Sequence, residues 1–434
     1  MAEEPATEGK ESASLGGNPS ANPHSPSSEE AGVIARTLHI ETPVSTSAPE
    51  QGYWPWVPRA FSALRHRNYR LYWVGQVLSL IGTWMQRTAQ GWLVTDLVLE
   101  IAQGQRVEAL TSWYVGLVTS MSTLPVLFLS GFLGLLADVM DRRKLLICTQ
   151  SLMAVQAFLL ALLTYTHTIN IPLLIVLSLF LGIVMSLDVP ARQGLVIHMV
   201  GKEDLPNAIA INSSVFNGAR VIGPAITGII LALKFSVADA FLVNALSFIP
   251  IIGAILLMRG RFAPRRRKQE ETRMPLVRVT AGVAYLATTP GLRRITLMLA
   301  IASLTSIPFI GVLPAFARYK LSASAVEFGF LSTFFGIGAF SGALTLAALS
   351  RRRVHHFTLR LGYLIFIASV LVFSQIRSIE VAGGILSLAG FGFSFAFPST
   401  NSIIQLKVPD ELRGRVMGVY SQLFIGLYPI GTLL

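Results

Sequence analysis

The sequence predicts an all-α membrane protein, a bundle of about eleven transmembrane helices in two similar halves. Of its 434 residues, 52% are hydrophobic and 13% are charged, and the mean hydropathy is +0.59. Soluble domains carry about 25% charged residues, so long stretches of this chain suit lipid, where each helix satisfies its own backbone hydrogen bonds. In addition, apolar runs of roughly 20 residues recur, and basic residues gather in short segments between them.

Residues 1–58 are rich in Ser, Pro, Glu, Gly and Ala and hold few large apolar residues. Such a segment cannot bury enough apolar surface to offset its ordering entropy. It also lacks the basic start and apolar run of a signal peptide. We therefore predict a disordered cytoplasmic tail.

Eleven apolar runs that follow are long enough to cross a bilayer. They lie near 71–98, 112–136, 144–166, 172–199, 208–233, 238–258, 293–317, 327–349, 357–376, 381–405 and 413–434. The polar segment 259–290 is the longest between them. It divides the membrane part into a six-helix half (59–258) and a five-helix half (291–434), and weak repeats of this kind are typical of transporters.

Basic residues concentrate in every second segment between the runs, near 59–70, 142–144, 259–268, 351–353 and 407–415. Because cytoplasmic loops carry the excess of Lys and Arg, this pattern predicts a multi-pass protein of the bacterial inner membrane with a cytoplasmic N-terminus and a basic cytoplasmic linker. A nucleic-acid site would gather the charges on one folded face. Although the net charge is +12, the placement of the charges between apolar runs therefore argues against a nucleic-acid partner.

The end of the second run reads Gly-Leu-Leu-Ala-Asp-Val-Met-Asp-Arg-Arg over 134–143. This segment resembles the signature of the major facilitator superfamily, although Val139 stands where a basic residue is usual and Asp141 where Gly is usual. The signature positions that are kept are Gly134, Asp138, Arg142 and Arg143. By this resemblance, Asp138 and Arg142 form a gating latch against the start of the eleventh span, near 412–415. Plain anchoring by positive charge is the alternative for Arg143.

Four further segments, 82–90, 188–193, 217–224 and 408–415, are similar to the branch of the superfamily that contains the enterobactin exporter and multidrug-type exporters. The resemblance implies a major-facilitator-type bundle of twelve spans with both termini inside. This chain stops at Leu434 as its eleventh span completes. We therefore expect the last helix to be missing and the C-terminus to lie outside.

The first span carries a polar stripe. On a helix of 100° per residue, its members fall within an arc of about 100°. They are Gln76, Ser79, Thr83, Gln86, Arg87 and Gln90. Exposing these six polar side chains to lipid would be costly. The stripe therefore predicts either the wall of an aqueous cavity or hydrogen bonds that join helices. We favour a substrate-facing wall, with Gln86, Arg87 and Gln90 as site residues, because Arg87 is charged.

In the fourth span, Asp188 and Arg192 lie four residues apart and can pair on one helix face. Burial disfavours the charge of the carboxylate while the arginine favours it. A group balanced in this way can take up and release a proton, so we predict a role in proton coupling. A permanent structural ion pair is the alternative.

In the fifth span, Asn217, Arg220 and Pro224 share a stripe, and Gly223 permits the close approach of a neighbouring helix. We predict that Asn217 and Arg220 belong to the site, with Asp188 as the counter-charge of Arg220 by the resemblance. Gly223 and Pro224 resemble a motif of exporters and are predicted gating residues; ordinary small-residue packing is the alternative.

The second half is nearly free of charge inside its spans. By the resemblance, its seventh and tenth spans line the opposite wall of the cavity. That wall would be rich in Phe, for example Phe391, Phe393, Phe395 and Phe397. An apolar wall suits an amphipathic organic molecule better than a sugar.

The sequence contains no Gly-rich phosphate loop, so ATP is not expected to drive transport. It has a single cysteine, Cys148, and neither metal-ligand spacing nor a nucleophile elbow. We therefore expect no enzyme activity, no cofactor and no metal. The sequence predicts a monomeric proton-coupled exporter of a small amphipathic molecule, drug-like or siderophore-like. A facilitator or importer on the same fold and a non-transporting relative remain alternatives.

Overall fold

A computed structural model describes residues 59–101, 107–201, 203–260, 275–350 and 355–433. Within these ranges the chain is helical with short connections and contains no strand. All of them belong to one compact unit, 51–434. The predicted disordered tail lies outside the described residues, as does 261–274 of the predicted linker.

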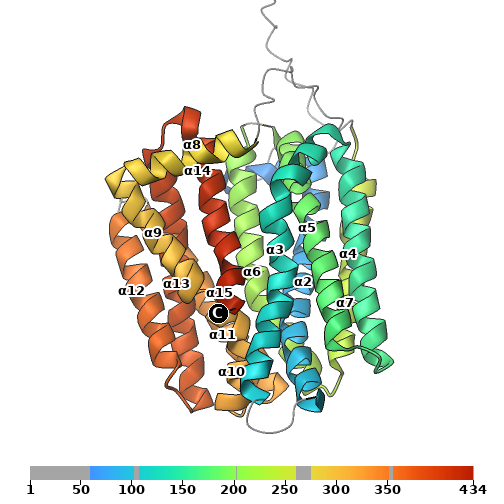
Figure 1. The fold of residues 1–434 in the computed structure, drawn as a ribbon. Helices are drawn as coiled ribbons and strands as arrows, with labels where there is room; N and C mark the ends of the chain where they lie inside the picture. The colour runs from blue at the N-terminus through green and yellow to red at the C-terminus, as the bar shows by residue number, and fades with distance from the viewer. Residues whose placement is uncertain (1–58, 102–106, 202, 261–274, 351–354, 434) are drawn as a thin grey trace, which may run out of the picture. The chain divides into compact units, whose positions relative to one another are not determined.

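Most of the long helices run side by side in one bundle (Figure 1). Those of the first half are η1 (Arg59–Arg65), α2 (Arg67–Ile101), α3 (Val107–Val139), α4 (Arg142–Tyr165), α5 (Ile171–Val200), α6 (Leu205–Ala232) and α7 (Val237–Leu256). Those that follow are α8 (Pro275–Thr288), α9 (Pro290–Thr305), α10 (Phe309–Lys320), α11 (Ala325–Ser350), α12 (His355–Phe373), α13 (Ile379–Lys407), α14 (Asp410–Ser421), η3 (Gln422–Gly426) and α15 (Leu427–Leu433).

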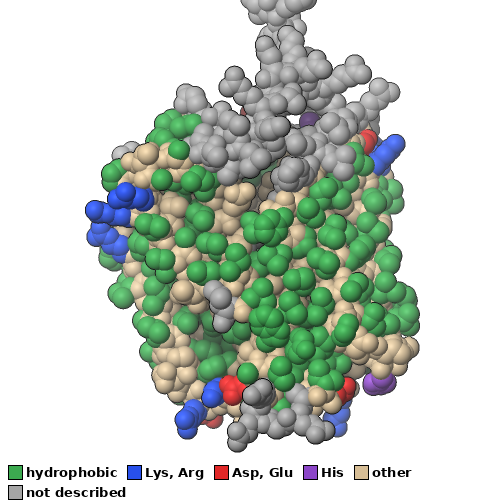
Figure 2. Space-filling model, in the orientation of Figure 1, with side chains coloured by type: hydrophobic (Ala, Val, Ile, Leu, Met, Phe, Trp, Pro, Cys, Tyr) green, Lys and Arg blue, Asp and Glu red, His purple; other side chains and the backbone are tan. Residues whose placement is uncertain are grey.

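Ten helical segments of the described chain are long and apolar enough to cross a membrane. The 35-residue α2 is not one of the ten, although its length exceeds that of any of them, and we attribute this to its polar stripe. The ten segments and α2 together occupy the eleven predicted runs. Figure 2 shows that hydrophobic side chains cover most of the middle of the face in view, with the charged side chains toward the two ends.

Two of the predicted spans are not single α-helices. The seventh is interrupted between α9 and α10 at Ser306–Pro308, where proline has no N–H to donate to the helix ladder. The eleventh consists of α14, one π-helical turn and α15. The linker also contains a helix, α8, which packs against α14.

The two halves meet where glycines bring helix backbones together. Helix α6 packs along α11, and a Cβ built on Gly329 would lie 2.6 Å from the Cα of Gly228. A Cβ built on Gly336 would likewise lie 2.7 Å from the Cα of Val221. Small residues of this kind allow close helix packing inside a membrane, where lipid gives no hydrophobic drive for association.

Because backbone atoms cannot move aside cheaply, Gly329→Ala should force α6 and α11 apart and lower stability by about 1–3 kcal/mol. Gly384→Ala is the matched control, since a Cβ at Gly384 of α13 meets nothing within 4 Å. Thermal unfolding of the purified variants in detergent measures the difference. Equal midpoints for the two variants would contradict the close packing.

Candidate functional site

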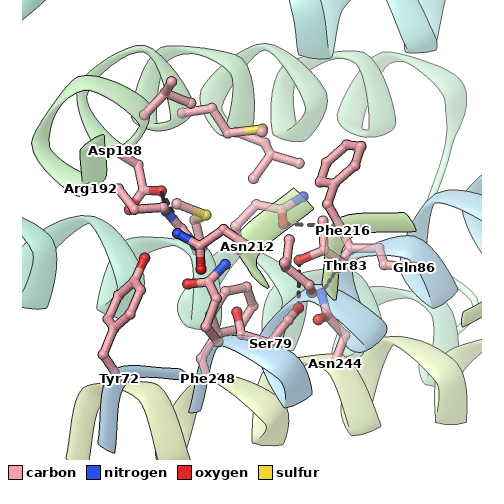
Figure 3. Close-up of a pocket in the computed structure, with 17 residues that line it drawn as sticks. Tyr72, Ser79, Thr83, Gln86, Asp188, Arg192, Asn212, Phe216, Asn244 and Phe248 are labelled. Carbon is pink, nitrogen blue, oxygen red and sulfur yellow. Dashed lines mark hydrogen bonds and ion pairs between the residues drawn. The ribbon is translucent and has the colours of Figure 1, made fainter. Parts of the chain in front are cut away.

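Five helices of the first half, α2, α4, α5, α6 and α7, surround a cavity of about 230 Å³ (Figure 3). Its wall combines polar groups with aliphatic and aromatic side chains. The lining residues are Tyr72, Gln76, Ser79, Leu80, Thr83, Gln86, Met153, Gln156, Leu181, Met185, Asp188, Val189, Arg192, Asn212, Phe216, Asn244 and Phe248. All of them come from the first half of the chain, so this cavity has no wall from the tenth span.

The carboxylate of Asp188 lies at one side of this cavity and is 3% exposed. One of its oxygens accepts hydrogen bonds from Thr149 Oγ1 (2.8 Å) and Gln150 Nε2 (2.6 Å) of α4. The other accepts from Nε (3.0 Å) and a terminal nitrogen (2.5 Å) of Arg192. The predicted pair therefore forms, and each of these four hydrogen bonds is donated to the carboxylate. Thr149 and Gln150 could not be identified from the sequence, because helix α4 shows no continuous polar stripe.

A second polar network crosses the cavity wall through Gln86. Its amide nitrogen donates to Gln156 Oε1 (3.2 Å), and its oxygen accepts from Asn244 Nδ2 (2.6 Å). The network joins α2 to α4 and α7. Gln86 was predicted from the stripe, whereas Gln156 and Asn244 are isolated polar residues in apolar runs and give no periodic signal.

The α2 stripe divides between two environments. Gln76, Ser79, Thr83 and Gln86 line the cavity. Gln90 does not: its amide donates to Ser178 Oγ of α5 (2.7 Å), which is a helix-to-helix contact. One buried polar atom at the cavity, Gln76 Oε1, has no hydrogen-bond partner among the described residues, so the wall retains a polar group that water or a ligand can satisfy.

Arg87 and Arg220 both lie beside one indole ring. Their guanidinium carbons are 5.1 and 5.0 Å from the centroid of Trp84. The Arg220 group also lies 5.3 Å from the ring of Phe216 and 5.2 Å from that of Phe393, which belongs to α13 of the second half. The expectation that Asp188 neutralises Arg220 is wrong, because that carboxylate is occupied by Arg192 and the arginine contacts aromatic rings instead.

Asn217, predicted to belong to the site, donates to the backbone oxygen of Ser213 on its own helix (2.9 Å) and is not part of the cavity lining. Its neighbour Gly223 has a packing role. A Cβ there would lie 2.8 Å from the backbone nitrogen of Met85, so this glycine seats α6 against α2. Pro224 is buried within α6, and its carbonyl oxygen lies at the contact with Gly329.

The predicted gating residues of the superfamily signature belong to the end of α3 and the start of α4. Arg142 donates to the backbone oxygen of Gly194 (3.3 Å) and contacts Nε2 of His198 (2.5 Å), both on α5. Arg143 donates to the backbone oxygen of Leu256 (2.6 Å). The side chains of Gly134, Asp138 and 413–415 lie outside the described residues, so the latch stays a prediction. Asp141 caps α4 by accepting from the backbone N–H of Arg143 and Lys144.

The phenylalanines predicted to form an apolar cavity wall mostly pack against other rings. Phe393 and Phe397 are buried in the core of the second half, with ring centroids 4.5 Å apart. Phe391 and Phe395 stack at 4.6 Å. Of these four, Phe393 alone contacts a charged group, Arg220.

The two halves are also joined by charged and polar contacts at the C-terminal ends of α2 and α10. Arg318 of α10 forms an ion pair with Asp96, donates to Thr95 Oγ1 (2.8 Å) and lies 4.9 Å from the ring centroid of Trp92. Nearby, Lys320 pairs with Glu108 at 3.7 Å, and the hydroxyls of Tyr319 and Thr111 are 3.0 Å apart. We call these residues the end cluster. Sequence reasoning did not identify it, because its charges are single residues in different helices.

The profile of the family described as transmembrane secretion effector matches residues 58–434. The chain belongs to this family of the major facilitator superfamily. Curated relatives include the staphyloferrin A transporter of Staphylococcus aureus, 25% identical over 362 residues (82% of this chain and 86% of the relative). The multidrug efflux pump Tap of Mycolicibacterium fortuitum is 25% identical over 324 residues (73% and 78%). The enterobactin exporter EntS of Salmonella typhimurium is 25% identical over 333 residues (75% and 77%).

Solved structures share the major facilitator fold. A bacterial homologue of the human lysosomal transporter Spinster, in an inward-facing and unoccupied conformation, superposes with a TM-score of 0.65 at 13% identity, covering 84% of this chain and 81% of that one. A D-xylose-proton symporter gives 0.61 at 12% identity, covering 85% and 88%. The predicted superfamily and fold class are confirmed, and the chain is a membrane transporter.

Asp188→Asn should lower stability by about 1–3 kcal/mol, because it leaves the half-buried guanidinium of Arg192 without its counter-charge. The double variant Asp188→Asn, Arg192→Gln removes both charges and should recover most of this loss. Thermal unfolding in detergent tests the coupling between the two sites. Additive effects of the two substitutions would show that the pair is not an interacting unit.

Proposed function

We propose that this major facilitator transporter is a proton-coupled exporter of a small amphipathic organic molecule in the bacterial inner membrane, and that it works by alternating access. The observation that carries the proposal is the cavity with Asp188 in its wall. A buried carboxylate beside a cavity is a group that can change its protonation state when access to the cavity changes. The exporters among the relatives support the outward direction.

The lining of the cavity supports an amphipathic substrate. Leu80, Met153, Leu181, Met185 and Val189 offer flexible apolar surface, as do the rings of Phe216 and Phe248. The polar groups of Gln76, Ser79 and Asn212 are interspersed among them. Sites for organic ligands are predominantly apolar with a few placed polar groups. A highly hydrated sugar would leave most of this surface unmatched.

The end cluster supports alternating access. It ties α10 of the second half to α2 and α3 of the first at one end of the bundle. On α2, Asp96 lies ten residues beyond Gln86, so the contacts are about 15 Å along the helix from the cavity wall. Side chains in these ion pairs are partly exposed, and such pairs contribute only about 0–1 kcal/mol each. Contacts of this strength can break when that end opens.

Proton coupling is tested with the full chain reconstituted in vesicles that carry a pH gradient. Asp188→Asn should abolish gradient-dependent export of a lipophilic dye while the protein still inserts. Arg294→Gln, an exposed position of α9, is the control and should export normally. Undiminished gradient-dependent export by Asp188→Asn would remove this residue from the coupling mechanism. Export that ignores the gradient in the wild type would instead favour a facilitator.

Alternating access requires the end cluster to separate in each cycle. In a Cys148→Ser background, the double substitution Glu108→Cys, Lys320→Cys places thiols on the two residues whose native side-chain ends approach to 3.7 Å. Because cysteine is shorter than either native side chain, the thiols are joined with a bifunctional thiosulfonate reagent that forms a reducible bridge. Bridging should lock this end and reduce transport at least about tenfold, and a reducing agent should restore it. The single Glu108→Cys variant is the control. Full transport by a completely cross-linked sample would show that this end does not need to open.

A further inference from the structure

Arg87 and Arg220 are the charged groups whose situation the proposed function leaves unexplained. Neither guanidinium has a hydrogen bond or an ion pair with another described residue, and Arg220 Nε is buried without a partner. A charge inside a membrane bundle is costly unless it is paired, hydrated or part of a functional site. The arginine in the cavity wall, Arg192, differs because Asp188 neutralises it.

Both arginines place a positive charge beside the same tryptophan ring. Both lie about 5 Å from the same Trp84 ring centroid, so the two like charges are at most about 10 Å apart and repel each other. Mutual repulsion raises the cost of holding the pair. A negatively charged ligand would offset this repulsion and would supply the hydrogen bonds that the two guanidinium groups lack.

The pair continues the wall of the cavity by one helical turn. Thr83 and Phe216 line the cavity, and each lies four residues before an arginine on the same helix face. Arg87 is exposed, although α2 packs against α3, α5, α6, α7, α10 and α11. The hydroxyl of Tyr428 on α15 is close enough to interact with Arg87 electrostatically. Arg87 therefore faces space between the two halves and not lipid.

The aromatic contacts determine how the guanidinium groups can act. A ring that stacks on a guanidinium plane uses the face of that plane, so the in-plane N–H groups stay available. Those N–H groups form a rigid fork that matches a carboxylate. Trp84, Phe216 and Phe393 also place apolar ring surface beside the charges. An aromatic or other flat apolar body next to an anionic group fits both features.

We propose that Arg87 and Arg220 form an anion subsite between the halves, and that the transported molecule is an aromatic or similarly apolar compound carrying a carboxylate or another delocalised negative charge. The anionic group accepts hydrogen bonds from the two arginines, and the apolar part extends past Phe216 into the cavity. The inference rests on the proposed function, because it names the substrate class of the same site.

The test uses equilibrium binding to the purified full chain in lipid nanodiscs with two probes of matched shape, naphthalene-2-carboxylate and naphthalene-2-carboxamide. The carboxylate should bind at least about tenfold more tightly, the fold-change expected for one charge-assisted hydrogen bond. Equal binding of the two probes would overturn the inference. This comparison needs no substitution, so it stays decisive if a variant fails to fold.

The variants assign the preference to residues. Arg87→Gln and Arg220→Gln should each reduce the preference for the carboxylate to below about threefold, while Arg220→Lys, which keeps the charge and loses the fork, should retain part of it. Arg294→Gln is the control for a surface arginine and should bind as the wild type does. A tenfold preference that survives in both glutamine variants would place the anion site elsewhere and overturn the inference.

A small inorganic anion is the competing occupant. Inorganic phosphate at millimolar concentration should displace the carboxylate probe weakly, since it lacks the apolar part. Displacement by phosphate as effective as by unlabelled carboxylate would overturn the assignment of an aromatic substrate. The proposed function fails separately, when no compound is exported from vesicles. If export occurs and the amide binds as well as the carboxylate, the anion subsite fails and the proposed function stands.

Discussion

The cost of holding charge inside a hydrocarbon layer governs the interior of this transporter. The charged side chains in and beside the cavity wall reduce that cost in two ways. Asp188 and Arg192 neutralise each other, and two neutral donors of α4 complete the shell of the carboxylate. Arg87 and Arg220 have no counter-charge among the described residues and are held against aromatic rings. The first arrangement is complete in itself, whereas the second gains from a ligand.

Two kinds of contact between the halves differ physically, and the difference suits the proposed alternating access. Near Gly228 and Gly329 the helices touch through backbone atoms, which depends on dispersion and shape and needs no exchange with water. At the end cluster, the halves are held by partly exposed ion pairs, which water can replace. A rocking motion that keeps the backbone contact and replaces the ion pairs of the end cluster with water would cost little free energy. Interfaces with two such discrete arrangements are the usual basis of switching.

Much of the fold could be predicted from the sequence, because hydropathy and the positions of basic residues are local signals. The eleven runs follow from them, and the superfamily follows from the resemblance of the segment at 134–143. The breaks at Pro308 and at 422–426 were missed, since an apolar run reads the same whether its helix is continuous or interrupted. The site was predictable where several polar residues share one helix face, as on α2. Thr149, Gln150, Gln156 and Asn244 are single residues whose meaning comes from other helices, so periodicity could not reveal them.

The error over the partner of Arg220 has the same origin. A sequence shows that a buried cation needs compensation, but it does not show whether a carboxylate, a ring or a ligand supplies it. The contacts of Arg220 with aromatic rings in place of a carboxylate also bear on the direction of transport. An anionic substrate moving out of a cell whose interior is negative gains about 2.3 kcal/mol per charge for each 100 mV. If the arginine pair selects anions, the membrane potential by itself would therefore favour export. Proton exchange at Asp188 would then add a second driving force in the same direction.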